Sequence, residues 1–288
     1  MRELARFAMK APRNAAGVAF VACLVPMMLW LGAATVDLVT LRHGTAKGFN
    51  VFVWAAIPAL GWWLGLQDPT ALVVLISTFA LAEVLRISVS MRRTLLFGFG
   101  FSILIGVLTP LLMPGAIEML LTVTDELLKQ LAEDAQLQVD DELKASFYSL
   151  MIASFAASFF AMSVASLFLA RSWQAALFNP GGWREEFHAL RMGSMDMTAI
   201  VIVMLIGPAI GLDGYLLVFS GLVPIIVCGF ALVHGLIGKK NLGGHWMIGF
   251  YALFIVLFPT LLAIVVLMAL IDSAVDIRSR VQASSGSQ

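Results

Sequence analysis

The sequence predicts an all-α protein: a polytopic transmembrane bundle of seven to eight membrane segments, built as a single domain over residues 1–288. Composition gives the first indication. The chain is 60% hydrophobic and only 12% charged, whereas soluble domains are about 45–50% apolar and about 25% charged. The second is that the apolar residues fall in long runs, as a helix needs to cross a hydrocarbon layer about 30 Å thick. Strand-like alternation of apolar and polar residues is absent from the sequence, which argues against a barrel.

The candidate spans follow the chain in order. They are 15–40, 49–66, 69–90, 94–115, 147–170, 196–211, 214–238 and 246–271. Basic connections follow the first, third, fifth and seventh of them, with Arg42, Arg92, Arg184 and Lys239 among their residues. Because cytoplasmic loops are enriched in Lys and Arg, alternation places these four connections in the cytoplasm. The sequence therefore predicts a multi-pass protein of the bacterial inner membrane.

The first segment conflicts with simple alternation. A single crossing would place outside the membrane the four basic residues that precede it, which are Arg2, Arg6, Lys10 and Arg13. Pro26 lies near the middle of 15–40, and proline interrupts a helix because it lacks a donor and clashes with the preceding turn. Two half-helices, about 14–25 and 27–41, could form a re-entrant hairpin with a cytoplasmic N-terminus and Pro26 near a buried tip. One kinked crossing helix with an external N-terminus is the alternative.

The segment 118–144 is acidic, with eight acidic and two basic residues. Its leucines recur at helical spacing, which predicts one or two amphipathic helices on the outer surface. Asp140 and Asp141 are expected to begin the long helix that follows, because acidic residues favour helix N-termini. We interpret the segment as a solvated connector, with a docking surface for a cation or a partner as the alternative.

Residues 171–195, which we call the elbow, are the second polar segment. Asn179 and Pro180 resemble the start of a helix and Gly193 its end. At 100° per residue one stripe is formed by Trp183, Phe187 and Leu190, and another by Arg184, His188 and Arg191. This pattern predicts a helix over 180–192 that lies along the cytoplasmic membrane surface, with its rings toward the bilayer or the bundle.

The polar residues of the elbow are also candidate contacts for a ligand or a partner. They are Asn179, Arg184, Glu185, Glu186, His188 and Arg191. Glu185 and His188 could form half of a di-iron ligand set, but that needs a second Glu-x-x-His pair, and the sequence has none. We therefore expect no metal and no cofactor.

Two stretches carry a family resemblance. RSWQAALFNPGGWREEFHALRMG (171–193) resembles the hallmark stretch of the YybS-like family, predicted bacterial membrane proteins of unknown function, and PMMLWLGAATVDLVTLRHG (26–44) is similar too. The architecture of that family resembles the substrate-binding subunits of energy-coupling-factor vitamin transporters, which have six helices. The resemblance implies a small-solute binding or transport subunit, which is our first functional hypothesis.

Charges inside membrane segments are costly and mark functional sites by default. Asp37 lies in the first segment, whereas Glu83 and Arg86 lie three residues apart in the third, where they share a helix face and can pair. These groups could neutralise each other or snorkel near the cytoplasmic interface. They could instead form the polar floor of a central cavity that holds a small molecule.

Small residues recur every four positions, as Gly61 and Gly65 and as Ala153, Ala157, Ala161 and Ala165. Such ridges let helices approach closely. We interpret them as internal packing surfaces, with contact to a membrane-protein partner or a second copy of the chain as the alternative. A non-transporting scaffold that recruits protein partners is accordingly our second functional hypothesis.

The sequence lacks the common catalytic motifs. It contains no P-loop, no HExxH and no G-x-S-x-G, so we do not expect an enzyme. Basic residues are too few and too dispersed for nucleic-acid binding. The expected partner is the lipid bilayer itself.

Overall fold

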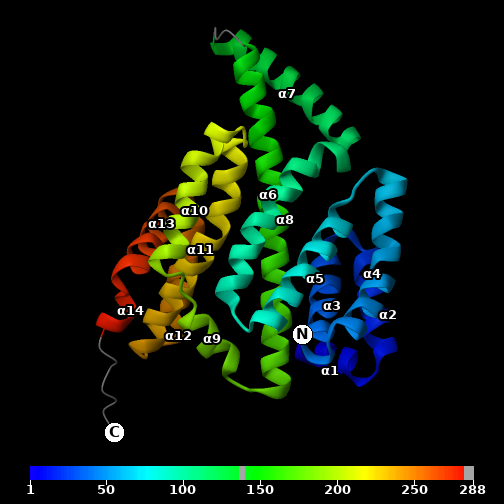
Figure 1. Ribbon diagram of the computed structural model, residues 1–288, viewed down its shortest axis with the longest axis vertical. Coiled ribbons are helices and arrows are strands. Elements are labelled where there is room, and N and C mark those ends of the chain that lie inside the picture. The colour runs from blue at the N-terminus through cyan, green and yellow to red at the C-terminus, as the bar shows by residue number, and fades with distance from the viewer. Residues whose placement is uncertain (136–139, 282–288) are drawn as a thin grey trace.

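The computed structural model describes residues 1–135 and 140–281, and this part of the chain is helical and contains no strand (Figure 1). The all-α prediction is therefore confirmed. Six of the described helices are long and apolar enough to cross a membrane: α4 (Thr45–Leu66), α5 (Thr70–Ser88), α6 (Met91–Leu112), α8 (Asp141–Phe178), α11 (Gly214–Lys239) and α13 (Phe258–Val275). A seventh candidate is bent by 61° and consists of α9 (Gly182–Ala189), α10 (Ser194–Ile206) and the 3₁₀ turn η2 (Gly207–Ile210). The chain is a multi-pass membrane protein.

The N-terminal segment folds as a hairpin. It comprises α1 (Arg2–Lys10), α2 (Pro12–Leu24), the 3₁₀ turn η1 (Pro26–Met28) and α3 (Leu29–His43). α2 and α3 pack side by side, because Gly32 of α3 lies against Cys23 and Ala19 of α2. The two ends of the hairpin meet the end of α8: the Arg2 guanidinium donates to the Ala176 carbonyl at 2.6 Å, and Arg42 lies over the Phe178 ring. The predicted hairpin is confirmed and a single crossing helix is excluded, whereas re-entry into the membrane and a cytoplasmic N-terminus stay predictions.

The tip of this hairpin is not covered by protein, contrary to the prediction of a buried tip. Met27 is 83% exposed. The main chain at the tip is nevertheless bonded, since the Trp30 indole donates to the Met27 carbonyl at 2.8 Å and the Trp62 indole of α4 donates to the Cys23 carbonyl at 3.1 Å. Such bonds matter because lipid cannot satisfy backbone polar groups. An apolar tip whose carbonyls are occupied can face lipid without protein cover.

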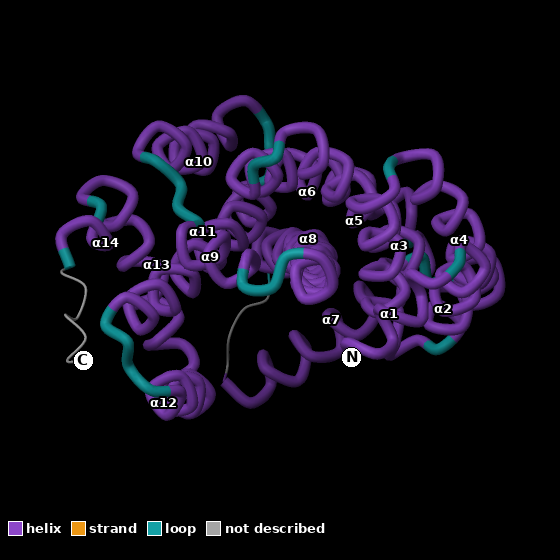
Figure 2. Tube along the Cα trace, turned by 90° about the horizontal axis from the view of Figure 1, so that it is seen from below, coloured by secondary structure: helices purple, strands orange, loops and turns teal. Residues whose placement is uncertain are grey.

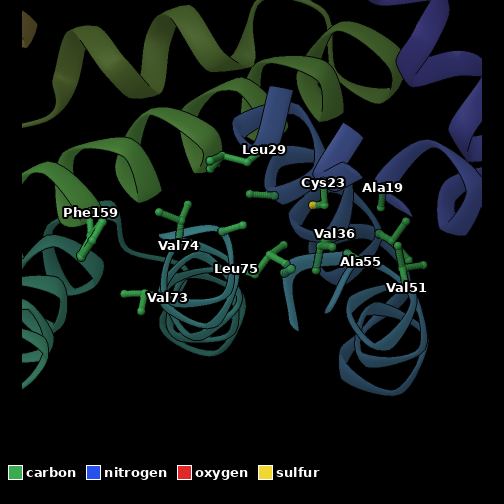
Figure 3. Close-up of a cluster of buried hydrophobic side chains, with 14 of the residues drawn as sticks. Ala19, Cys23, Leu29, Val36, Val51, Ala55, Val73, Val74, Leu75 and Phe159 are labelled. Atoms are coloured by element: carbon green, nitrogen blue, oxygen red, sulfur yellow. The ribbon is translucent and has the colours of Figure 1, made fainter. Parts of the chain in front are cut away.

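α3 is the buried centre of the N-terminal half. It packs against α2, α4, α5 and α8, and Figure 3 shows one of the apolar clusters that results, with small side chains such as Ala19, Cys23, Val36 and Ala55 in contact. Seen from below, α8 stands between this half and the helices α10 to α14 (Figure 2). Its 38 residues make it about 57 Å long, so it extends well beyond the hydrocarbon layer and joins the two halves.

The predicted span 246–271 is wrong, because the structure divides it into α12 (Gly244–Val256) and α13. α12 runs antiparallel to α11, with Tyr251 hydrogen-bonded to His234, and α13 then returns parallel to α11 with Val265 against Gly229. The physical reason is Pro259 in the first turn of α13, since proline cannot continue the preceding helix. The chain thus has a second proline-broken hairpin that the sequence analysis missed.

The basic connections meet at one end of the bundle, which we call the elbow face. Arg92 pairs with Asp196 at 3.2 Å, and the Lys239 ammonium donates to the carbonyl of Arg278 in α14 (Ile277–Arg280) at 2.6 Å. α7 (Pro114–Ala135) lies at the opposite end (Figure 1). The predicted common location of the basic connections is confirmed, whereas its assignment to the cytoplasm stays a prediction.

The acidic segment 118–144 is built mainly from α7 and the start of α8, and its residues 136–139 lie outside the described part of the chain. Asp140 begins α8 as predicted, because its carboxylate accepts a hydrogen bond from the Leu143 amide at 2.8 Å. Lys144 pairs with Asp125 of α7 at 3.4 Å. Both partners of this pair are about half exposed, so it contributes little to stability.

Candidate functional site

The elbow begins with a sharp reversal of the chain. α8 continues to Phe178, and the backbone N–H of Asn179 closes its end by donating to the Ala175 carbonyl at 2.8 Å. Gly181 then takes a φ of +93°, a conformation that glycine adopts without strain. The predicted N-cap role of Asn179 is therefore wrong, because residues 179–181 are used by the turn.

α9 is shorter than the predicted helix 180–192. It ends at Ala189, and Gly193 caps the start of α10 instead of the end of α9. The predicted apolar stripe is confirmed on the bundle side: Leu190 is 6% exposed, and Trp183 and Phe187 pack with it against the core. α9 is a short amphipathic helix attached to the bundle by its rings.

An open cavity of about 670 Å³ lies between α9 and the ends of α8, α11 and α12. We call it the elbow cavity. One part of its wall is a cluster of rings, whose centroids lie 5.1 Å apart for Phe168 and Trp183, 5.4 Å for Trp183 and Phe187, and 5.3 Å for Phe187 and His234. Rings at these separations attract one another beyond the effect of area burial. This part of the wall is therefore a connected set of rings that three helices contribute.

A hydrogen-bonded pair lies in the same cavity. His234 Nε2 of α11 and the Tyr251 hydroxyl of α12 are 2.8 Å apart. The sequence analysis did not select either residue, although a histidine inside an apolar run is a functional candidate by default. That signal was available for His234, whereas the approach of Tyr251 depends on how α12 folds back along α11.

Two predicted residues, Arg184 and His188, do line the elbow cavity. Arg184 is exposed and supplies a positive charge at its edge. Burial, helped by the nearby charges of Arg184 and Arg278, lowers the pKa of His188 below its ordinary value of 6.5. At neutral pH His188 is thus a neutral imidazole that can donate or accept a hydrogen bond.

His188 also fixes the position of α9 on α11. Gly235 and Gly238 form the contact surface, since a Cβ atom at Gly235 would lie 2.8 Å from the His188 carbonyl oxygen and one at Gly238 would lie 2.6 Å from its ring. The same carbonyl accepts a hydrogen bond from the Arg278 guanidinium at 2.7 Å. Two glycines therefore let the elbow approach closely enough to close one side of the cavity.

Arg191 does not join the other two basic residues of its predicted stripe. Its guanidinium donates to the carbonyls of Asp272 and Ser273 at 2.9 and 3.0 Å and so caps the end of α13. It also lies 3.7 Å from the Asp272 carboxylate, which is 4% exposed. The predicted stripe is wrong at this position, because α9 ends before Arg191 and the chain changes direction.

The other polar residues of the elbow lie outside the cavity lining. Glu186 pairs with Arg171 of α8 at 2.8 Å, and Glu185 is exposed. The side chain of Asn179 lies against Gly182 within the turn. These residues shape the elbow, and the structure does not bring them to the ring wall.

The membrane-segment charges form separate sites. Glu83 accepts from the Thr45 hydroxyl at 2.9 Å, Arg86 donates to that hydroxyl at 3.0 Å, and the two charges lie 3.6 Å apart, so their predicted pairing is confirmed. Asp37 is fully buried, and its carboxyl oxygens have no hydrogen-bond partner among the described residues. None of the three lines the elbow cavity. A buried carboxyl without a partner is costly, so Asp37 remains a separate candidate.

The small-residue ridges are only partly used for packing. Ala153 is buried, Ala157 is half-buried, and Ala161 and Ala165 are exposed on α8. Gly61 and Gly65 of α4 have open space where a Cβ would lie. Internal packing is therefore the wrong interpretation for these two glycines and for the exposed end of the α8 ridge. Their neighbours within the described chain do not require small residues there.

No protein-family model matches this chain, and comparisons with curated proteins and with solved structures gave no match either. The resemblance to the YybS-like family therefore stays a prediction.

Proposed function

We propose that the protein is a small-solute binding or transport subunit of the bacterial inner membrane, with the elbow cavity as its ligand site. The cavity itself is the observation that carries this proposal. Its volume of about 670 Å³ lies within the range of about 300–1,000 Å³ that small-molecule sites occupy. Its lining also has the usual composition of such sites, because aliphatic and aromatic side chains make up most of it and a few polar groups are placed among them.

The lining favours a planar, largely apolar ligand that carries one acidic group. The rings of Phe168, Trp183 and Phe187 offer faces and edges on which an aromatic or conjugated body can stack. Arg184 offers a planar guanidinium that fits a carboxylate with two parallel hydrogen bonds. The His234–Tyr251 pair can then orient a polar edge of the ligand.

The C-terminal hairpin supports the transport part of this proposal. Tyr251 and Met247 of α12 line the cavity, and α12 is joined to α13 at a proline-broken turn. Interrupted helices build substrate sites in many secondary transporters. The proposal also agrees with the architecture that the YybS-like resemblance implies, that of the energy-coupling-factor substrate-binding subunits.

A matched pair of probes tests ligand binding. We would add naphthalene-2-carboxylate or its uncharged carboxamide to the full-length protein in mild detergent and measure thermal unfolding. A ligand at 100 times its Kd stabilises by about 2.7 kcal/mol, and we expect the carboxylate to stabilise more than the amide. Arg184→Gln should remove this difference, and Arg93→Gln, an exposed arginine outside the cavity lining, should keep it. Equal or absent stabilisation by both probes would contradict the proposal.

A scaffold function is the second candidate, and the exposed end of the α8 ridge favours it. Ala161 and Ala165 present small side chains on an uncovered face of a long helix, and such faces suit close contact with another helix. Ala161→Cys would be treated with a membrane-permeant crosslinker in intact cells. A specific crosslinked protein would support the scaffold, and crosslinking only at random collision rates would argue against it.

A further inference from the structure

A second cavity opens on the elbow face, where the α1–α2 junction meets the α3–α4 junction. It has a volume of about 560 Å³, and we call it the head-group pocket. Two lysines, Lys10 and Lys47, line it together with the imidazole of His43 and the side-chain amide of Asn50, and none of its lining residues is acidic. Lys10 and Lys47 are exposed and form no ion pair within the described residues. The pocket is thus positively charged without a neutralising partner.

Two apolar grooves run along α2, and one of them continues directly from this pocket. The first, of about 520 Å³, shares Pro12 and Asn50 with the pocket and passes Phe20 and Trp54 between α2 and α4. The second, of about 670 Å³, follows the other side of α2 beside α1 and α3. Both are lined by the ridge of α2 that separates them, formed by Arg13, Gly17 and Val21. The charged pocket therefore leads into the first groove, and the second groove lies just across the ridge, whose pocket end carries the further basic residue Arg13.

We infer that this surface binds an anionic glycerophospholipid, with its phosphate in the head-group pocket and its two acyl chains in the two grooves. Charge complementarity favours an anionic lipid over phosphatidylcholine, because the positively charged choline group would be repelled by the two lysines of the pocket. The 13 residues of α2 span about 20 Å, which covers one leaflet of a hydrocarbon core about 30 Å thick. Protein leaves this face of α2 uncovered, so the lipid would complete the packing of the hairpin. This site is independent of the elbow cavity.

The test compares lipids of equal chain length. Full-length protein in mild detergent is incubated with micelles that contain phosphatidylglycerol and phosphatidylcholine in equal amounts, and bound lipid is counted by native mass spectrometry. We expect phosphatidylglycerol to be retained preferentially. Lys10→Gln and Lys47→Gln should each lower its occupancy about fivefold, the effect expected from one lysine near an anionic head group. The matched control Arg93→Gln with Lys240→Gln removes two exposed charges of the elbow face and should leave the occupancy unchanged.

A groove variant distinguishes a lipid from free phosphate. Gly17→Leu should fold normally, because no atom lies within 4 Å of the added Cβ and leucine favours helix more than glycine. The leucine side chain would project from the ridge into the space that the acyl chains occupy in the grooves, so phosphatidylglycerol retention should fall several-fold. Unchanged retention in Gly17→Leu, with inorganic phosphate displacing the lipid from the wild type, would show a site for free phosphate and overturn the proposal. Equal losses in the lysine variants and the control, or no loss in the lysine variants, would overturn it as well.

Discussion

Gly235→Ala and Gly238→Ala perturb the contact between α9 and α11, and each acts on a different part of His188. A Cβ at position 235 meets the main-chain oxygen of His188 at 2.8 Å, whereas one at 238 meets its ring at 2.6 Å. Ordinary van der Waals contact begins at about 3.4 Å. Each substitution therefore requires a displacement of more than half an ångström, in the first case of the backbone and in the second of a side chain that can rotate.

The expected costs differ for that reason. Overpacking typically destabilises by about 1–3 kcal/mol, and Gly235→Ala also weakens the bond from Arg278 to the His188 carbonyl, which lies at 2.7 Å. A hydrogen bond to a charged group contributes about 1.5–3 kcal/mol. Alanine also has a higher helix propensity than glycine, which offsets about 1 kcal/mol of this loss of stability. We expect a net loss of about 2 kcal/mol for Gly235→Ala and of about 1 kcal/mol or less for Gly238→Ala.

A second substitution separates the two contacts. His188→Ala removes the ring but keeps the carbonyl, so Gly238→Ala should become neutral or stabilising in that background. Gly235→Ala should still destabilise, because the oxygen that it meets is unchanged. Such coupling between neighbouring substitutions is what a double-mutant cycle measures.

Thermal unfolding of the full-length protein in detergent is the assay. Gly61→Ala and Gly65→Ala, which have open space around the added methyl group, serve as controls and should not destabilise. The proposed contact between α9 and α11 is refuted if Gly238→Ala has the same effect with and without the His188 ring. It is also refuted if Gly235→Ala behaves like the two controls.

Three further predictions follow from the contacts of the elbow and the hairpin. Arg191→Gln should destabilise by about 2–3 kcal/mol, because two carbonyls lose a charged donor, whereas Arg184→Gln should change stability by less than about 0.5 kcal/mol; comparable melting temperatures would contradict this. Trp62→Phe should cost about 1 kcal/mol through the lost bond at the hairpin tip, while Trp54→Phe, an exposed position on the same helix, should cost less; the reverse order would refute the role of the indole. The pKa of His188 in the folded protein lies below its ordinary value of 6.5. Between these two pKa values the folded protein binds fewer protons than the unfolded chain, so stability should fall as pH falls below about 6.5. His188→Gln should reduce this acid sensitivity in melts at about pH 7.5 and about pH 5, and an unchanged pH dependence would refute the assignment.

The helical class and most spans could be predicted because they depend on local properties. An apolar run of membrane length specifies a helix whatever its neighbours are. The hairpin at Pro26 was predicted correctly because the basic residues before it conflicted with a single membrane crossing. Pro259 has the same physical effect on 246–271, but no charge conflict accompanied it, and the break was missed.

The candidate site could be predicted only in part. Helical spacing correctly predicted that Trp183 and Phe187 share the apolar face of the helix, and that face packs on the bundle, since the periodicity of apolar residues identifies this face. It could not show that His234 and Tyr251 meet, because that contact depends on how α12 folds back on α11. Arg191 was misplaced for a related reason: a stripe is meaningful only as far as the helix continues.

The enclosure of α3 has a consequence for how the chain is made. The hairpin leaves the ribosome before α8, yet the helices that surround α3 include α8, which ends more than a hundred residues later. At a synthesis rate of ~5–20 residues per second, that delay is on the order of ten seconds. During this interval α3 lacks one of its helical neighbours, so a segment that is synthesised early completes its native surroundings late. Nascent chains that stop before α8 should leave the α8-facing side of α3 open to labelling, and chains that extend past Phe178 should protect it.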